Sequence, residues 1–278
     1  MTTLLLVLLI AIGSLFAGLL GSLTGLGGGV VIVPLLVLVF GVDIRYAMGA
    51  SLISVIATSS GAAAAYVKEG FSNIRIGMFL EIATTLGAVL GASLAVRLPA
   101  GLISGIFGAV LLLSAVISLR DWKDPSDDGP PDPLATRLRM DSTYPSLDGP
   151  RSYRVRRIPS GFGMMFGAGA LSGLLGIGSG AFKVLAMDQV MRIPFKVSTT
   201  TSNFMIGVTA AASAGIYLRR GLVAPGLAMP VVLGVIAGSM IGTHILVKTR
   251  TKWLRIVFCL VILALGIEMI YTALTGRL

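Results

Sequence analysis

The feature that most constrains this chain is a series of long apolar runs, such as Leu4 to Leu20 and Ala100 to Leu119. Each is close to the 20 or so residues that an α-helix needs to cross a hydrocarbon core of about 30 Å. Charged residues make up only 12% of the chain, against about 25% in soluble domains. The alternating segments typical of an outer-membrane barrel are not evident in the sequence. The sequence therefore predicts an all-α polytopic membrane protein.

Ten apolar segments are expected, five on each side of a polar stretch. The polar stretch, residues 120–159, is rich in Pro, Gly, Asp and Arg, and such a composition buries too little apolar surface to order itself. We therefore expect a first membrane repeat at residues 1–119, a flexible linker at 120–159 and a second membrane repeat at 160–278. The apolar segments lie at about 4–23, 30–40, 47–67, 76–96, 101–119, 161–175, 181–191, 197–218, 223–247 and 253–273.

The two repeats share one sequence pattern. A shift of 151 residues carries the glycine-rich stretch Gly25–Gly29 onto Gly176–Gly180, and Ser51 onto Ser202. The same shift, without a gap, relates Gly18 to Gly169, Tyr66 to Tyr217, Gly87 to Gly238, Gly91 to Gly242 and Phe107 to Phe258. The chain is therefore expected to be an internal duplication. With five segments in each half, the two halves would insert with inverted topology.

The distribution of positive charge predicts the orientation. The chain carries 22 Lys and Arg residues and a net charge of +10, which first suggests nucleic acid as a partner. Most of them lie in short connections that share one side of the membrane when the N-terminus is outside, which fits the cytoplasmic Lys/Arg bias of membrane proteins. We expect the bilayer as a partner, no nucleic acid, and a cytoplasmic linker. No Lys or Arg precedes Arg45, so the first segment is expected to stay as a helix and not to be cleaved.

The glycine stretches precede the two shortest segments, 30–40 and 181–191, which are too short to span comfortably and are candidates for re-entrant hairpins. Short, glycine-interrupted segments at matching positions of inverted repeats point to a transporter's binding site. A helix that starts inside the membrane offers unpaired N–H groups to an anion. The alternative is that these glycines only permit close helix packing. The backbone candidates for substrate binding are Gly27, Gly28, Gly29, Gly178, Ser179 and Gly180.

Lys183 is the strongest candidate among the side chains for substrate binding, because its counterpart in the first repeat is the apolar Ile32. A charge at mid-bilayer costs about 2.5–3.5 kcal/mol on insertion scales and therefore faces the protein interior. We expect Lys183 to supply positive charge to an anion site; the alternatives are pairing with Asp188 or with a carbonyl, or snorkelling. The hydroxyl and amide groups of Ser51, Thr200, Thr201 and Asn203 are candidate donors to an oxyanion, although helix capping and interhelical bonding also use them.

Three ionisable residues within the apolar segments are candidates for proton coupling: Asp188, Glu81 and His244. None of the three is matched at the equivalent position of the other repeat. Cys259 is the only cysteine, which excludes an internal disulfide and a multi-cysteine metal cluster. No spaced ligand set or nucleophile–base arrangement is apparent, so we expect no metal, no cofactor and no enzyme activity.

The sequence resembles the TauE/SafE family of membrane permeases, also described as sulfite exporters. The resemblance rests on Gly18–Gly21 leading into Gly25–Gly29, Pro34, Ala50–Leu52, Gly173–Gly180 and Ser198–Asn203. It covers nearly the whole chain except the linker, and it implies an inner-membrane protein that moves sulfite or organosulfonates out of the cytoplasm. The second repeat departs from the first at Ser179, Lys183, Leu185 and Asp188, which leaves the substrate open.

The primary hypothesis is a secondary transporter that exports a small sulfur-containing anion by alternating access. A passive anion channel, or an importer of a related oxyanion such as thiosulfate, are the alternatives. A non-transporting scaffold is a weaker reading, since a scaffold does not need buried polar residues at a pseudo-symmetric centre. The sequence leaves the coupling ion and the oligomeric state open.

Overall fold

The computed structural model describes residues 3–24, 28–68, 71–119, 132–146, 149–248 and 251–276. The first repeat contains α1 (Thr3–Thr24), α2 (Gly29–Pro34), the π-helix η1 (Leu35–Val39), α3 (Ile44–Lys68), α4 (Ile74–Ala95) and α5 (Ala100–Leu119). The second repeat contains α7 (Ile158–Leu175), α8 (Gly180–Leu185), the π-helix η2 (Ala186–Val190), α9 (Phe195–Arg219), α10 (Pro225–Lys248) and α11 (Thr251–Thr275). Between them lie α6 (Pro133–Arg137) and the strands β1 (Ser142–Ser146) and β2 (Gly149–Tyr153).

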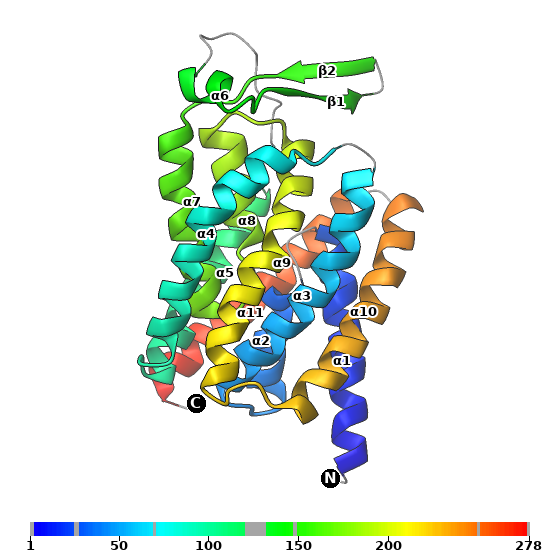
Figure 1. Ribbon diagram of the computed structural model, residues 1–278. Coiled ribbons are helices and arrows are strands. Elements are labelled where there is room, and N and C mark those ends of the chain that lie inside the picture. Colours follow the sequence, from blue (N-terminus) through cyan, green and yellow to red (C-terminus); the bar gives the residue numbers. More distant parts are fainter. Residues whose placement is uncertain are drawn as a thin grey trace.

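The positions of the helices repeat with the same 151-residue shift as the sequence. Elements α8, η2, α9, α10 and α11 each begin 151 residues after α2, η1, α3, α4 and α5, respectively. Both second segments are short, as the sequence predicts: a six-residue helix continues directly into a five-residue π-helix. In Figure 1, α1 runs toward the end of the bundle that carries the strands, whereas its counterpart α7 runs away from it.

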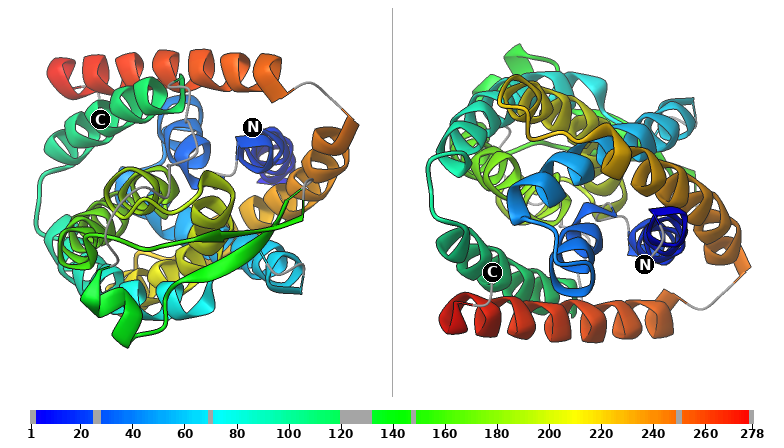
Figure 2. Two further views of the ribbon diagram at one scale, coloured as in Figure 1. Left: turned by 90° about the horizontal axis from the view of Figure 1, so that it is seen from above. Right: turned by 90° about the horizontal axis from the view of Figure 1, so that it is seen from below.

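Within the described residues, four helices are long and apolar enough to cross a membrane: Leu4–Gly21, Ile74–Ala95, Ala100–Ile117 and Ile158–Leu175. Their outward faces carry exposed leucine, isoleucine and phenylalanine side chains, as a lipid-facing surface requires. Helices α3 and α9 are richer in serine, threonine and alanine, and they pack against each other. Seen from both ends, α5 and α11 lie together along one side of the bundle (Figure 2).

The two repeats exchange packing partners. Helix α1 packs against α10, and α4 packs against α7, so the first helix of each repeat lies on the fourth helix of the other. Glycines allow this approach: a Cβ atom at Gly91 would collide with the carbonyl oxygen of Ala170, and one at Gly238 with that of Leu15. These duplicated glycines therefore serve close helix packing, which is their usual use in membranes.

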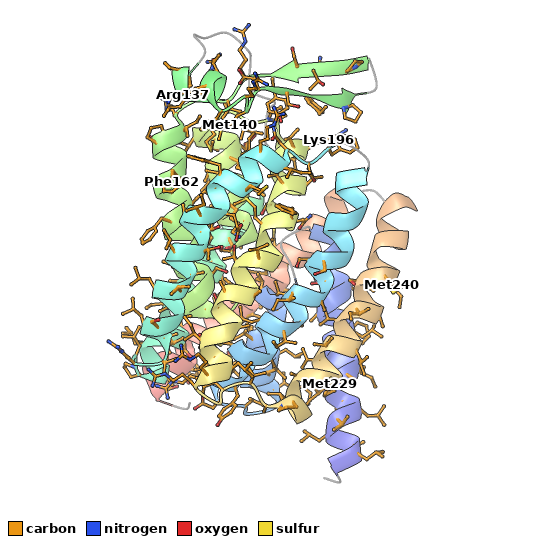
Figure 3. The ribbon with its side chains drawn as sticks, in the orientation of Figure 1. Arg137, Met140, Phe162, Lys196, Met229 and Met240 are labelled. Atoms are coloured by element: carbon orange, nitrogen blue, oxygen red, sulfur yellow. The ribbon has the colours of Figure 1, made fainter. Side chains whose placement is uncertain are left out.

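The stretch between the repeats differs from the unordered linker that its composition predicts. Helix α6 and the antiparallel pair β1–β2 form a cap over one end of the bundle (Figure 1). Figure 3 shows Arg137 and Met140 at this end, whereas Met229 of α10 lies toward the other end of the bundle. The physical reason is a minority of apolar side chains. Met140, Tyr144 and Val155 are buried in one cluster with residues of α4, α7 and η2, so the cap gains apolar burial that the average composition of residues 120–159 conceals.

Asn73, in the loop before α4, connects the cap to both repeats. Its Nδ2 donates to the carbonyl of Met140 (2.9 Å) and to the hydroxyl of Tyr153 (2.7 Å), while its Oδ1 accepts from Ile76 N and caps α4. Its backbone N–H donates to Thr201 Oγ1 on α9 at 3.1 Å. One side chain and its amide thus join the cap, α4 and α9.

Candidate functional site

A chain of three polar side chains lies inside the bundle where α4, α8 and α9 meet. Lys183 of α8 is fully buried, and its Nζ donates to Thr209 Oγ1 on α9 at 2.5 Å. Thr209 Oγ1 in turn donates to Glu81 Oε1 on α4 at 2.7 Å. An ammonium and a carboxylate are therefore joined through one hydroxyl, and the carboxylate comes from the other repeat.

Glu81 is largely buried, with 8% of its surface exposed. Its Oε1 also accepts from Thr85 Oγ1, one turn further along α4, at 3.1 Å. The hydroxyl of Thr84 lies 3.4 Å from that of Thr209. Oxygen Oε2 of Glu81 has no hydrogen-bond partner in the described part of the chain. One carboxylate oxygen is thus held by threonines, and the other is available to a proton or a ligand.

The site holds opposite charges that stabilise each other. Glu81 and Lys183 attract electrostatically across Thr209. An isolated ion would be strongly disfavoured in this environment, and pairing offsets much of that cost. Lys183 is the only buried basic residue among those whose side chains the structure describes. The prediction that it faces the protein interior is confirmed by its burial, and its partner is Thr209 rather than Asp188.

The equivalent place in the other half is not charged. The 151-residue shift carries Lys183 back to Ile32, which is fully buried, and Glu81 forward to Val232. Thr209 corresponds to Thr58, whose hydroxyl donates to carbonyls of its own helix, Ser54 O at 3.1 Å and Val55 O at 3.2 Å. The duplication therefore supplies two similar frames, and among the described residues one of them carries a lysine and a glutamate joined through a threonine.

The two glycine breaks meet beside the crossing of α3 and α9. Ser51 Oγ donates to the carbonyl of Gly176 at 2.8 Å, and a Cβ atom at Gly29 would lie 2.7 Å from that same hydroxyl and 3.3 Å from Ile177 Cα. Gly29 is therefore closely packed, and a larger residue there would have to displace the Ser51 hydroxyl. Gly28, the N-cap of α2, accepts from Val31 and Ile32 N–H. Gly25, Leu26 and Gly27 lie outside the described residues.

The second break has an unusual backbone. Gly178 and Ser179 both have positive φ, 75° and 46°, and the left-handed conformation is costly for a serine. Ser179 is 2% exposed, and its Oγ has no hydrogen-bond partner within the described residues. Its carbonyl accepts the N–H of Lys183, and Gly180 O accepts from Ser202 Oγ at 3.4 Å. This strained turn starts the helix that carries Lys183.

Several predicted residues are not brought to Lys183. Thr200 Oγ1 donates to Lys196 O at 3.0 Å, and Thr201 Oγ1 accepts from Asn73; Thr201 lies two turns, about 12 Å, from Thr209 along α9. Asn203 is half-buried. The remaining candidates are Asp188, buried in η2 and accepting from Gln189 Nε2 at 2.7 Å, and His244, whose helix is described but whose side chain is not.

The bridging role of Thr209 is the part of the site that sequence reasoning understates. Its match with Thr58 across the repeat marks the position, but nothing in a linear sequence places Thr209 between Lys183 and Glu81. Thr84 and Thr85 carry no signal beyond their spacing from Glu81 on one helix. No group of three or more His, Cys, Asp or Glu residues that could hold a metal occurs in the part of the chain searched, which is the described part.

Comparison with known proteins gives one consistent result. The model of the family described as sulfite exporter TauE/SafE matches residues 9–269. The probable membrane transporter protein YunE of Bacillus subtilis (strain 168) is 30% identical over 273 residues, which cover 95% of this chain and 97% of YunE. The probable membrane transporter protein YdhB of the same strain is 26% identical over 249 residues, covering 88% and 94%. A probable membrane transporter protein of Xylella fastidiosa (strain 9a5c) is 28% identical over 270 residues, covering 95% of each chain. No solved structure matches the chain.

Proposed function

Because this chain belongs to the sulfite exporter TauE/SafE family of multi-pass membrane transporters, we propose that it exports a small sulfur-containing anion, sulfite or an organosulfonate. The observation that carries the proposal is the fully buried ammonium of Lys183. A buried cation inside a membrane bundle is costly to maintain. A substrate that carries negative charge supplies a reason for keeping it there.

Alternating access is the proposed mechanism. The matched helices, the opposite directions of α1 and α7, and the exchange of partners between the repeats support two inverted-topology repeats that rock against each other (Figure 1). The site lies where α4 of one repeat meets α8 and α9 of the other. Movement of one repeat relative to the other therefore changes the surroundings of Lys183. The Lys/Arg distribution supports an external N-terminus and a cytoplasmic cap.

In the proposed site, the Lys183 ammonium binds the anion by charge and by the two N–H donors that remain beside its bond to Thr209. We propose the Ser179 hydroxyl, which lies four residues earlier and has no described hydrogen-bond partner, as a further donor. We propose that backbone N–H groups at Gly178 to Gly180, the candidates from the sequence, also donate to the anion. Thr200, Thr201 and Ser51 are structural in this proposal, because their hydroxyls hold backbone groups.

The test is anion flux in proteoliposomes with purified protein, using sulfite and a membrane-impermeant sulfonate. We expect saturable flux in the wild type and at least tenfold less in Lys183→Met. Ile32→Met makes a comparable change at the equivalent uncharged position and serves as the matched control. Equal flux in the two variants would refute the site, and flux that does not saturate with substrate would favour a channel.

A further inference from the structure

The Glu81 carboxylate and a transported anion are alternative partners for the same cation. In the structure the carboxylate already faces Lys183 through Thr209. A second negative group beside Lys183 would leave two anions and one ammonium in a buried site. Two negative groups that share one buried site strongly favour protonation of one of them. Occupancy of Lys183 by substrate is therefore linked to the protonation of Glu81.

We propose that Glu81 is the internal counter-ion of Lys183 and that it takes up one proton with each anion bound. This inference rests on the proposed function, which assigns anion binding to Lys183, and it specifies how that site is coupled. With no substrate bound, the carboxylate neutralises the ammonium. With substrate bound, the anion neutralises the ammonium, and the carboxyl group carries a proton. Anion and proton then leave to the same side, so they move together.

The geometry provides a place for that proton. Oε1 is engaged by Thr209 and Thr85, whereas Oε2 is buried and has no described hydrogen-bond partner. Protonation at Oε2 leaves the threonine contacts of Oε1 in place, and a neutral carboxyl group is better suited than a carboxylate to a buried position.

Among the residues that the structure describes, one charged group acts on Glu81. On α4 itself its neighbours are Thr84 and Thr85, α9 contributes Thr209, and α8 contributes Lys183. Helix α7 approaches α4 with Gly169 against the Thr84 carbonyl. Among the described residues, Lys183 is the charged side chain that acts on Glu81. The charge state of Glu81 therefore follows the occupancy of Lys183.

The net charge moved in each transport cycle, and with it the effect of the membrane potential, depends on the charge of the substrate. A monovalent sulfonate that moves with one proton carries no net charge. A dianion that moves with one proton carries one net negative charge, and an inside-negative membrane potential drives that charge outward. The same site thus gives voltage-driven export for a dianion and movement driven by concentration and pH gradients for a monoanion.

The experiment measures anion and proton entry together. Proteoliposomes with a pH-sensitive dye inside receive an inward gradient of methanesulfonate or of thiosulfate, neither of which changes its own protonation near neutral pH. We expect the lumen to acidify as anion enters, with one proton per anion for both probes. An inside-positive potential should accelerate thiosulfate entry and leave methanesulfonate entry unchanged.

Glu81→Gln supplies the discriminating variant, because an amide resembles the protonated carboxyl group in shape and carries no charge. We expect the number of protons that enter with each anion to fall at least tenfold in Glu81→Gln. Val232→Gln makes an amide at the equivalent position and should keep the wild-type number of protons per anion.

Wild-type anion entry without acidification would overturn the inference and leave the proposed function intact, even if Glu81→Gln failed to fold. Undiminished acidification in Glu81→Gln would also overturn it. No protein-dependent flux of sulfite or of either probe would overturn the proposed function and this inference together.

Discussion

Replacing Thr209 with valine removes the hydroxyl that joins Lys183 to Glu81 while preserving the branched shape of the side chain. Hydrogen bonds to charged groups contribute about 1.5–3 kcal/mol each, and loss of a partner leaves the buried group unsatisfied. Thr209 makes two such bonds. Glu81 keeps its hydrogen bond from Thr85 in this variant, which limits the loss. We therefore expect the free energy of unfolding to fall by about 3 kcal/mol, roughly a hundredfold in the folding equilibrium.

The matched control is Thr58→Val at the equivalent position of the first repeat. The Thr58 hydroxyl donates to carbonyls of its own helix, and the loss of a neutral bond of this kind costs about 0.5–1.5 kcal/mol. The assay is thermal unfolding of the purified protein in detergent, together with anion flux after reconstitution. Thr209→Val should unfold roughly 5–10 °C lower and lose most of its flux, whereas Thr58→Val should change little. Equal effects in the two variants would refute the bridging role.

Four further variants test other parts of the fold. Gly173→Ala places a Cβ atom against the Ala88 carbonyl and should lower the unfolding temperature strongly, whereas Gly167→Ala on the same helix meets nothing within 4 Å and should be neutral or slightly stabilising. Burial raises the pKa of Tyr153 from its ordinary value of 10.0 to about 12, so the folded chain holds this proton more tightly than the unfolded chain. The resulting stability is present below pH 10 and is lost between pH 10 and pH 12, so unfolding temperatures over that range should fall more steeply for the wild type than for Tyr153→Phe. Asn73→Ala removes the side-chain contacts to the cap and should raise proteolysis within the cap in a limited-digestion assay. An unchanged digestion pattern would show that Asn73 does not hold the cap in place.

The sequence predicts the helical part of the fold well because a membrane permits few kinds of spanning structure. Apolar length identifies the crossing segments, and the 151-residue shift anticipates where the elements of the second repeat begin. The cap was not predicted, because the burial of Met140, Tyr144 and Val155 depends on helix ends far away in the sequence. Local composition predicts how a segment behaves in isolation, whereas the cap is ordered by its contacts with α4, α7 and η2.

For the candidate site, the sequence identifies the charged residues but not their relation. Lys183 stands out because Ile32 occupies its counterpart, and Glu81 because it interrupts an apolar segment. Their proximity follows from the packing of α4 against α9, which joins the two repeats. Thr200 and Thr201, which the sequence offers as donors to the same anion, make other contacts in the structure: Thr200 donates to Lys196 O, and Thr201 accepts from the Asn73 N–H.

The asymmetry of the site follows from this exchange of helices. In the half of the molecule that holds the site, Lys183 of α8 and Glu81 of α4 are joined through Thr209 of α9. The corresponding positions of the duplication are Ile32, Val232 and Thr58. A cation placed in α8 alone would remain an uncompensated buried charge, and a carboxylate in α4 alone would be equally unfavourable. Each substitution is therefore less costly in the presence of the other, although they lie in different repeats. Restoring the apolar pair, Lys183→Ile with Glu81→Val, should consequently destabilise the protein less than either single change while abolishing transport. If the double variant unfolds at a lower temperature than both single variants, the two charges are not coupled.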